Sequence, residues 1–277
     1  MSSRDYPPLP PLAGPLPTED GIHRVRLADG REAWLKQRRD QPAAFLEAEA
    51  DGLERLRHAG GLRLPLLLGL EDHRLLLGDL GQGQPHPEFA AQAGRGLAMQ
   101  HRWSKRAFGL PRNGWCGESP QDNTPDTDGH RFFAKRRLLP QARRAHRAGR
   151  LEGTDLDGVE RLCTRLPNLV PMQPAVLLHG DLWIGNLHCC TDGSPALIDT
   201  GAVHYGWAEA ELAMLVLFGE PPSSLFEAYA EQASLHADWR ERAPIYNLYH
   251  LLNHLNLFGG GYLGAVRSVL RRFAGSR

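Results

Sequence analysis

Short alternating runs of apolar and polar positions dominate the first third of the chain and predict β-strands. Residues 22–27 and 32–36 form two such runs, and the Asp29-Gly30 pair between them is typical of a hairpin turn. Two further apolar runs lie within residues 62–80, separated by glycine and polar positions. Together these runs predict a small antiparallel sheet near the N-terminus.

Between these strands, residues 43–59 change to a helical period. The apolar positions on one helix face are Phe45, Leu46, Leu53 and Leu56. Glu49 lies in the middle of this face, where a carboxylate is costly unless it is paired. Strand alternation places Lys36 on the same face as Trp34, and Lys36 is the natural partner of Glu49. The alternative is that Glu49 lies at a frayed edge in water.

Helical periodicity dominates after about Gly78. It predicts helices over residues 88–102, 130–148, 156–166, 207–219, 223–234 and 241–257. The one clear interruption is at residues 176–199, where short apolar runs flank a polar loop. The pattern indicates an α+β fold with two lobes, in which a small antiparallel β-sheet N-lobe with one helix precedes a larger, mainly helical C-lobe.

The N-terminal segment is rich in proline. The prolines within residues 7–17 exclude a helix or a central strand. An extended leader is therefore favoured over a proline-rich ligand for a partner domain. We therefore expect a leader and a following loop at residues 1–21, an N-lobe at 22–78 and a C-lobe at 79–277.

Charge and composition narrow the class of protein. Lys plus Arg and Asp plus Glu both number 32, so the chain lacks the basic excess usual in a nucleic-acid binder. We find no apolar stretch of the roughly 18 residues that a membrane span needs, and no signal peptide. The four cysteines lack the spacing of a zinc site or a disulfide scaffold, which favours reduced thiols. We expect a cytoplasmic protein that is a monomer or a weak dimer.

The clearest chemistry lies within the polar interruption. Phosphoryl transfer from ATP needs a carboxylate beside the acceptor hydroxyl and oxygen ligands for magnesium. Asp181 and Asn186 have the spacing of a kinase catalytic loop, and Asp199 ends the next apolar run, at the position of a metal-binding aspartate. Each element alone is a weak signal. The full set in order, with Lys36 and Glu49 upstream, is typical of a kinase.

The run from His179 to Asn186 reads HGDLWIGN and resembles the catalytic loop of the fructosamine kinase (ketosamine 3-kinase) family, within the aminoglycoside-phosphotransferase-like kinases. Further segments that resemble the family are WLK at 34–36, FLEAE at 45–49, FFAKRRLLPQ at 132–141, LIDTG at 197–201, YG at 205–206, EAEL at 209–212 and NHLNLFG at 253–259. The resemblance runs from about residue 22 to the end of the chain. It implies a two-lobed, protein-kinase-like fold.

The resemblance also implies a reaction, in which ATP with Mg²⁺ phosphorylates a small-molecule hydroxyl, most specifically O3 of a fructosamine or ribulosamine. By this resemblance, Lys36 would contact the ATP phosphates and Glu49 would hold Lys36 in place, while Gly78, Asp79 and Leu80 would form the hinge that contacts adenine. Asp181 would be the base, and Asn186 and Asp199 would bind magnesium. Glu211 would anchor the catalytic loop. Trp183 would lie on the substrate side, either stacked on a sugar face or packed between loop and helix.

Two departures from the family pattern stand out. Relatives carry a glycine-rich phosphate loop where this chain has LPTEDG at residues 16–21, and Glu19 and Asp20 add negative charge where phosphate should lie. Thr200 and Gly201 replace the Pro-Ala that follows the metal-binding aspartate. The first departure keeps a weak or inactive kinase open as a hypothesis.

The same residues allow other interpretations. The acceptor could instead be an aminoglycoside, a choline-like alcohol or a sugar alcohol, and a pseudokinase would keep the fold as a binding module without catalysis. Asp199-Thr-Gly resembles an aspartic protease segment, but that chemistry needs two such aspartates. His250 and His254 lie on one helix face as in zinc proteases, but Leu251 replaces the glutamate that those sites need, which favours packed histidines.

Overall fold

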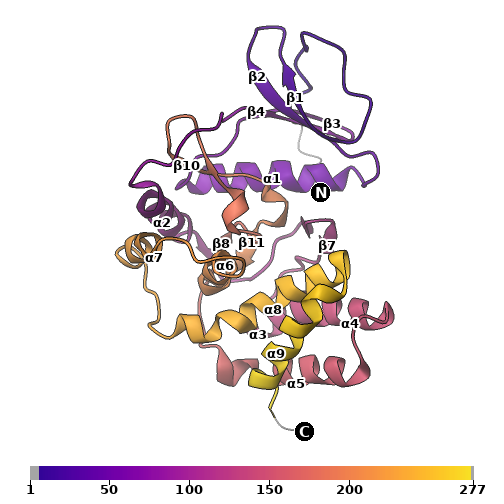
Figure 1. Cartoon of the computed structure of the whole chain (residues 1–277), viewed down its shortest axis with the longest axis vertical. Coiled ribbons are helices and arrows are strands. Elements are labelled where there is room, and N and C mark those ends of the chain that lie inside the picture. The colour runs from indigo at the N-terminus through magenta and orange to yellow at the C-terminus, as the bar shows by residue number, and fades with distance from the viewer. Residues whose placement is uncertain (1–5, 276–277) are drawn as a thin grey trace.

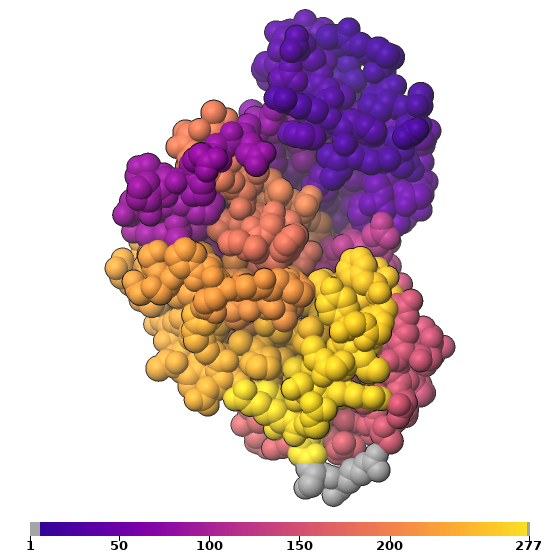
Figure 2. Space-filling view, viewed as in Figure 1, coloured from indigo at the N-terminus to yellow at the C-terminus, as the bar shows by residue number. Residues whose placement is uncertain are grey.

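The chain folds into two lobes of unequal size (Figure 1). The computed structural model describes residues 6–275, so residues 1–5 of the predicted leader and 276–277 of the predicted C-lobe lie outside the described part. Figure 2 shows the smaller lobe as an indigo and purple mass above a larger body. This is the two-lobed α+β architecture expected from the sequence.

A four-stranded antiparallel sheet forms the N-lobe. In the order β1-β2-β4-β3, its strands are β1 (Gly21–Arg26), β2 (Glu32–Gln37), β4 (Arg74–Gly78) and β3 (Leu67–Glu71). Alternation along β2 is as predicted, because Ala33 and Leu35 are buried in a small core of their own. Trp34 and Lys36, on the other face, line the cleft between the lobes.

The proline-rich leader covers the face of the sheet that points away from the cleft. It runs extended, as predicted, and the amide of Ala13 donates to the carbonyl of Arg26 at 2.8 Å while the amide of Leu70 donates to the carbonyl of Pro7 at 2.9 Å. Leucines of the leader pack against a small buried core made of Leu27, Ala33, Leu35 and Leu76. Because proline lacks a backbone donor, this segment covers the sheet without adding a regular strand.

Helix α1 (Ala44–Ala59) lies beneath the sheet and contacts both lobes (Figure 1). Gly52 approaches the C-lobe so closely that a Cβ atom at this position would lie 2.1 Å from the carbonyl oxygen of Thr200. The hydroxyl of Thr200 also donates to the carbonyl oxygen of Glu49 at 2.8 Å. Helix α1 is therefore fixed against the segment that follows Asp199.

Helices form most of the C-lobe. In chain order they are α2 (Phe89–Gln100), α3 (Gly129–Phe132), α4 (Leu139–Arg147), α5 (Gly153–Leu169), α6 (Ala208–Leu215), α7 (Ser223–Ala230), α8 (Trp239–Phe258) and α9 (Leu263–Phe273). A π-helical segment, η1 (Phe133–Leu138), joins α3 to α4, so the helix predicted at 130–148 is one stretch with changing geometry. Within residues 6–275, no helix combines the length and the apolar character that crossing a bilayer requires.

Several helix boundaries differ from the prediction. Helix α5 begins at Gly153 rather than 156, because the side chains of Glu152 and Asp155 form a reciprocal capping box there. Helix α6 ends at Leu215 rather than 219. Helix α9 was not predicted at all, since its apolar positions follow a run of glycines and are separated by arginines.

The C-lobe also contains short strands, which flank its loops. They are β5 (Ser104–Lys105), β6 (Gly114–Cys116), β7 (Ser119–Gln121), β8 (Ala175–Leu178), β9 (Leu187–Cys189), β10 (Pro195–Leu197) and β11 (His204–Gly206). The prediction of a single interruption in the helical pattern was wrong, because β5, β6 and β7 form a second one. The interruption predicted at 176–199 is confirmed: β8 ends directly before the catalytic loop, and the antiparallel pair β9 and β10 leads to Asp199.

A buried ion pair joins α6 to α8. The guanidinium of Arg242 donates to both carboxylate oxygens of Glu209, at 2.9 and 2.8 Å, and the hydroxyl of Tyr246 donates to the same carboxylate at 2.7 Å. The side chains of Arg242 and Glu209 are 9% and 3% exposed. We expect Arg242→Met to lower the free energy of unfolding in urea by about 3–5 kcal/mol, because it leaves a buried carboxylate without its cation.

Arg143→Met is the matched control for this prediction. Arg143 forms an ion pair with Glu160 at 3.4 Å in which both side chains are about half exposed. Such pairs contribute at most about 1 kcal/mol. Equal losses of stability in the two variants would contradict the importance of the buried pair.

Candidate active site

Two adjoining cavities open along the cleft between the lobes. The hinge-side cavity, of about 660 Å³, is lined by β1, β2, β4 and the segment that follows β4. The loop-side cavity, of about 340 Å³, reaches from α1 to the catalytic loop. Ile22, Lys36 and Asp199 line both cavities, so these residues mark the seam where the two meet.

Lys36 makes the ion pair that the sequence predicted. Its Nζ donates to Oε1 of Glu49 at 2.6 Å and also to Oδ1 of Asp199. Both Lys36 and Glu49 are largely buried. Burial opposes the charged ammonium, but the attraction of the Glu49 and Asp199 carboxylates outweighs it and raises the pKa of Lys36. Lys36 is therefore held as a cation at the seam of the two cavities, in contact with both lobes.

Glu211 holds the catalytic loop from below. Its carboxylate accepts from the backbone amides of His179 at 3.0 Å and Gly180 at 2.7 Å. The side-chain amide of Asn186 donates to the carbonyl oxygen of Asp181 at 2.8 Å, which closes the loop on itself. Asp181 and Asn186 thereby line the same cavity as Lys36.

The segment after β4 forms one wall of the hinge-side cavity, lined by Gly78, Asp79 and Leu80. The carboxylate of Asp79 is tied to the sheet, because it accepts from Nε1 of Trp34 at 3.0 Å and from the guanidinium of Arg24 at 3.1 Å. The side chain of Asp79 is thus committed to structure. Part of the backbone is engaged as well, because the amide of Gly78 donates to the carbonyl of Leu66 at 2.8 Å and the carbonyl of Leu80 accepts from the amide of Thr191 at 3.2 Å.

Aromatic side chains line the loop-side cavity. Phe45 comes from α1, Trp115 from β6 and Trp183 from the catalytic loop. Trp183 is 40% exposed, and its nearest ring partner is Phe218, edge-on with a distance of 6.5 Å between ring centroids. The ring also packs on Gly185, where a Cβ atom would lie 2.3 Å from the indole. The placement of Trp183 on the substrate side stays a prediction.

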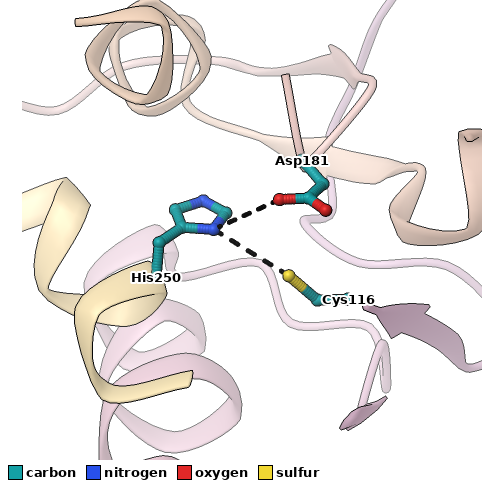
Figure 3. A group of neighbouring side chains, drawn as sticks. All are labelled: Cys116, Asp181 and His250. Carbon is teal, nitrogen blue, oxygen red and sulfur yellow. Dashed lines mark hydrogen bonds and ion pairs between the residues drawn. The ribbon is translucent and has the colours of Figure 1, made fainter. Parts of the chain in front are cut away.

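Asp181 lies against two residues that were not predicted to be near it (Figure 3). Oδ1 of Asp181 is 3.6 Å from Nδ1 of His250, and this nitrogen is 3.8 Å from Sγ of Cys116. Burial raises the pKa of Asp181 to about 6 and lowers the pKa of His250 to about 3. Near pH 7 the site thus holds an ionised carboxylate beside a neutral imidazole.

The Lys36–Glu49 pair, the catalytic loop and Asp199 are arranged as in a kinase, and the comparison with known families agrees. The fructosamine kinase family model matches residues 20–275. The chain belongs to the fructosamine kinase family. Its fold is protein-kinase-like, as the sequence resemblance implied.

Individual relatives extend the match over most of the chain. A protein of Synechocystis sp. named as a ketoamine kinase is 35% identical over 256 residues, covering 89% of this chain and 84% of the relative. The chloroplastic protein-ribulosamine 3-kinase of Arabidopsis thaliana is 32% identical, with 87% and 76% covered. A crystal structure from Thermobifida fusca assigned as a fructosamine-3-kinase is 37% identical, with a TM-score of 0.84 and 90% and 88% covered.

The departure from the fructosamine kinase pattern at residues 16–21 is less severe than the sequence suggested. The carboxylate of Asp20 accepts from the backbone amides of Arg39 and Asp40 at 3.0 and 3.1 Å, and from Nε of Arg39 at 2.9 Å. Glu19 and Asp20 line neither cavity. Asp20 is therefore paired at the end of β2 and its charge is partly balanced. The effect of Glu19 and Asp20 on ATP binding stays a prediction.

His250 and Cys116 are the residues near the base that sequence reasoning missed. The sequence pattern groups His250 only with His254, as packed histidines on one helix face. His254 is indeed packed, stacked on Phe218 at a ring distance of 5.1 Å. His250 instead contacts Asp181. Cys116 carried no sequence signal, because it reaches the site on a strand of three residues.

Proposed function

We propose that this protein transfers the γ-phosphoryl group of ATP to O3 of a ketosamine of the fructosamine or ribulosamine type. The observation that carries the proposal is that Asp181, on the loop that reads HGDLWIGN, lines one cavity together with Lys36 and Asp199. The names of the relatives, ketoamine kinase and protein-ribulosamine 3-kinase, support the acceptor class.

In this proposal ATP occupies the hinge-side cavity. The backbone of Gly78, Asp79 and Leu80 would contact adenine, since these residues line the wall of that cavity. Lys36, held by Glu49 at the seam, would contact the phosphates where they pass toward the loop-side cavity. A cation fixed at this point stabilises the charge that spreads over the transferring phosphoryl group.

Asn186 and Asp199 fit magnesium. Both offer the hard oxygen ligands that this ion prefers, and both line the loop-side cavity beside Lys36. Magnesium bound there would neutralise charge on the phosphate oxygens. The residues themselves orient the phosphates, and the amide nitrogen of Asn186 is already engaged by the Asp181 carbonyl, which leaves its oxygen as the ligand atom.

Asp181 would act as the base. Its carboxylate accepts the proton of the acceptor hydroxyl as the hydroxyl oxygen forms a bond to the γ-phosphorus and the bond from this phosphorus to the ADP oxygen breaks. Trp183 would stack on the sugar face of the acceptor. A cytoplasmic location and a monomeric or weakly dimeric state stay predictions.

An assay of acceptors tests the function. We expect the purified protein, with ATP and Mg²⁺, to phosphorylate a free ketosamine, and mass spectrometry with NMR to place the phosphate on O3. A 3-deoxy ketosamine is the matched control and should give no product. Phosphorylation of an amino alcohol or aminoglycoside in preference to ketosamines would reject the acceptor class and keep the kinase. Absence of both product and ATP binding would favour a pseudokinase.

A further inference from the structure

Cys116, Asp181 and His250 form a compact cluster of potential metal ligands (Figure 3). They come from three separate parts of the chain, namely strand β6, the catalytic loop and helix α8. One ligand atom of each residue lies within 4.8 Å of the other two. Nδ1 of His250 is the centre of the group, 3.6 Å from the Asp181 oxygen and 3.8 Å from the Cys116 sulfur.

These distances suit a tetrahedral zinc ion. Zinc bonds to sulfur, nitrogen and oxygen imply separations of roughly 3.4–3.6 Å between neighbouring ligand atoms. Two of the three pairs are already within about 0.3 Å of that range. The third pair, the Asp181 oxygen and the Cys116 sulfur, lies within 4.8 Å. The donor set of thiolate, imidazole and carboxylate also selects zinc over magnesium, which requires oxygen ligands.

A second, independent feature is a hydrogen-bond donor at the sulfur. The side-chain amide of Asn253 donates to Sγ of Cys116 at 3.4 Å and to its carbonyl oxygen at 3.1 Å. Gln141 donates to Oδ1 of Asn253 at 3.2 Å, which turns the amide nitrogen of Asn253 toward the sulfur. Asn253 is buried. Donors of this kind orient and stabilise a metal-bound thiolate.

An ion would approach the cluster from the loop-side cavity, by way of Asp181. Asp181 lines that cavity, as do Trp115 and Gly117 on either side of Cys116. Cys116 and His250 lie behind Asp181, 2% and 6% exposed. Three protein ligands leave the fourth position of a tetrahedral zinc ion for water.

We propose that Cys116, Asp181 and His250 bind one zinc ion, and that the bound ion inhibits the kinase by holding the carboxylate of Asp181 away from the acceptor hydroxyl. A zinc–sulfur bond forms as the thiol proton leaves to solvent. The inhibitory part of this inference rests on the proposed role of Asp181 as the base, whereas the binding of zinc does not.

Metal binding is measured on the full chain without ATP or acceptor, so its result stands apart from the proposed function. We expect equilibrium dialysis against Zn²⁺, with Mg²⁺ in excess, to give one zinc per chain. Cobalt as a probe should show thiolate-to-metal charge-transfer absorption. Cys116→Ser and His250→Gln should each weaken zinc binding by more than about 100-fold. Loss of a residue that only hydrogen-bonds to a metal ligand weakens metal binding by at most about 100-fold. Cys163→Ser, a free cysteine on α5, is the matched control and should bind as the parent does.

Activity gives the second readout. Each variant is compared with and without zinc, relative to its own metal-free rate, after its melting temperature has been checked. Zinc should inhibit the parent and the Cys163→Ser variant, reversibly on addition of a chelator, but not Cys116→Ser. No zinc bound by the parent, or equal zinc binding by the parent and both ligand variants, would overturn the site. Inhibition that persists in Cys116→Ser would overturn the mechanism of inhibition.

Discussion

Replacement of Asp181 by alanine is expected to lower kcat by about 10²- to 10⁴-fold, the contribution usual for a positioned proton acceptor. With a pKa raised only to about 6, the carboxylate is ionised near pH 7 and able to take the acceptor proton. Asp181 does not line the hinge-side cavity. The affinity for ATP should therefore stay close to that of the parent protein, as measured by titration calorimetry.

Steady-state kinetics separates this role from a structural one. A contact made in the transition state alone lowers kcat and kcat/KM by the same factor. Asp181→Asn, which keeps the volume of the side chain and loses the proton acceptor, should behave as the alanine variant does. If both variants retain the parent kcat while the KM for the acceptor rises, Asp181 binds substrate and does not act as the base.

Asp199→Asn is expected to lower kcat by about 10³-fold or more, because it removes an anionic ligand of an ion whose charge stabilisation is worth several kcal/mol. The fold should remain, since Lys36 keeps its contact with Glu49 when the Asp199 contact is weakened. Turnover by a coupled ADP assay and melting temperature are the two measurements.

Asp192→Asn is the control for this variant. Asp192 lies in the turn between β9 and β10, a few residues before Asp199, and pairs with Arg63 at 3.1 Å in an exposed ion pair. Its loss should leave turnover unchanged. An Asp199→Asn protein that melts as the parent does and phosphorylates at the parent rate would show that Asp199 does not hold the metal.

The Lys36–Glu49 pair could be predicted because two periodicities constrain it. Alternation fixes the face of β2 that carries Lys36, and the helical period places Glu49 among apolar neighbours, where it needs a cation. The two elements follow each other in the chain and pack together, so little freedom is left. The structure confirms the contact at 2.6 Å.

The surroundings of Asp181 could not be predicted in the same way. Cys116 lies on a strand of three residues and His250 on a helix more than a hundred residues further along, so no local pattern relates them. The interpretation of the charge at residues 16–21 was incomplete for a related reason. The charge was counted without a partner, whereas Asp20 pairs with Arg39 across the β1–β2 hairpin. Contacts between distant segments of irregular structure leave no repeating pattern of apolar and polar positions in the sequence, so they cannot be predicted from it.

Helix α1 has little freedom to tilt. Gly52 rests on the carbonyl of Thr200, and the hydroxyl of Thr200 holds the carbonyl of Glu49. Any swing that separated Glu49 from Lys36 would have to drag the Thr200 segment with it. The Lys36–Glu49 pair and the segment after Asp199 therefore belong to one packed unit that joins the two lobes. A change of shape on ligand binding would therefore have to keep helix α1 and this segment together.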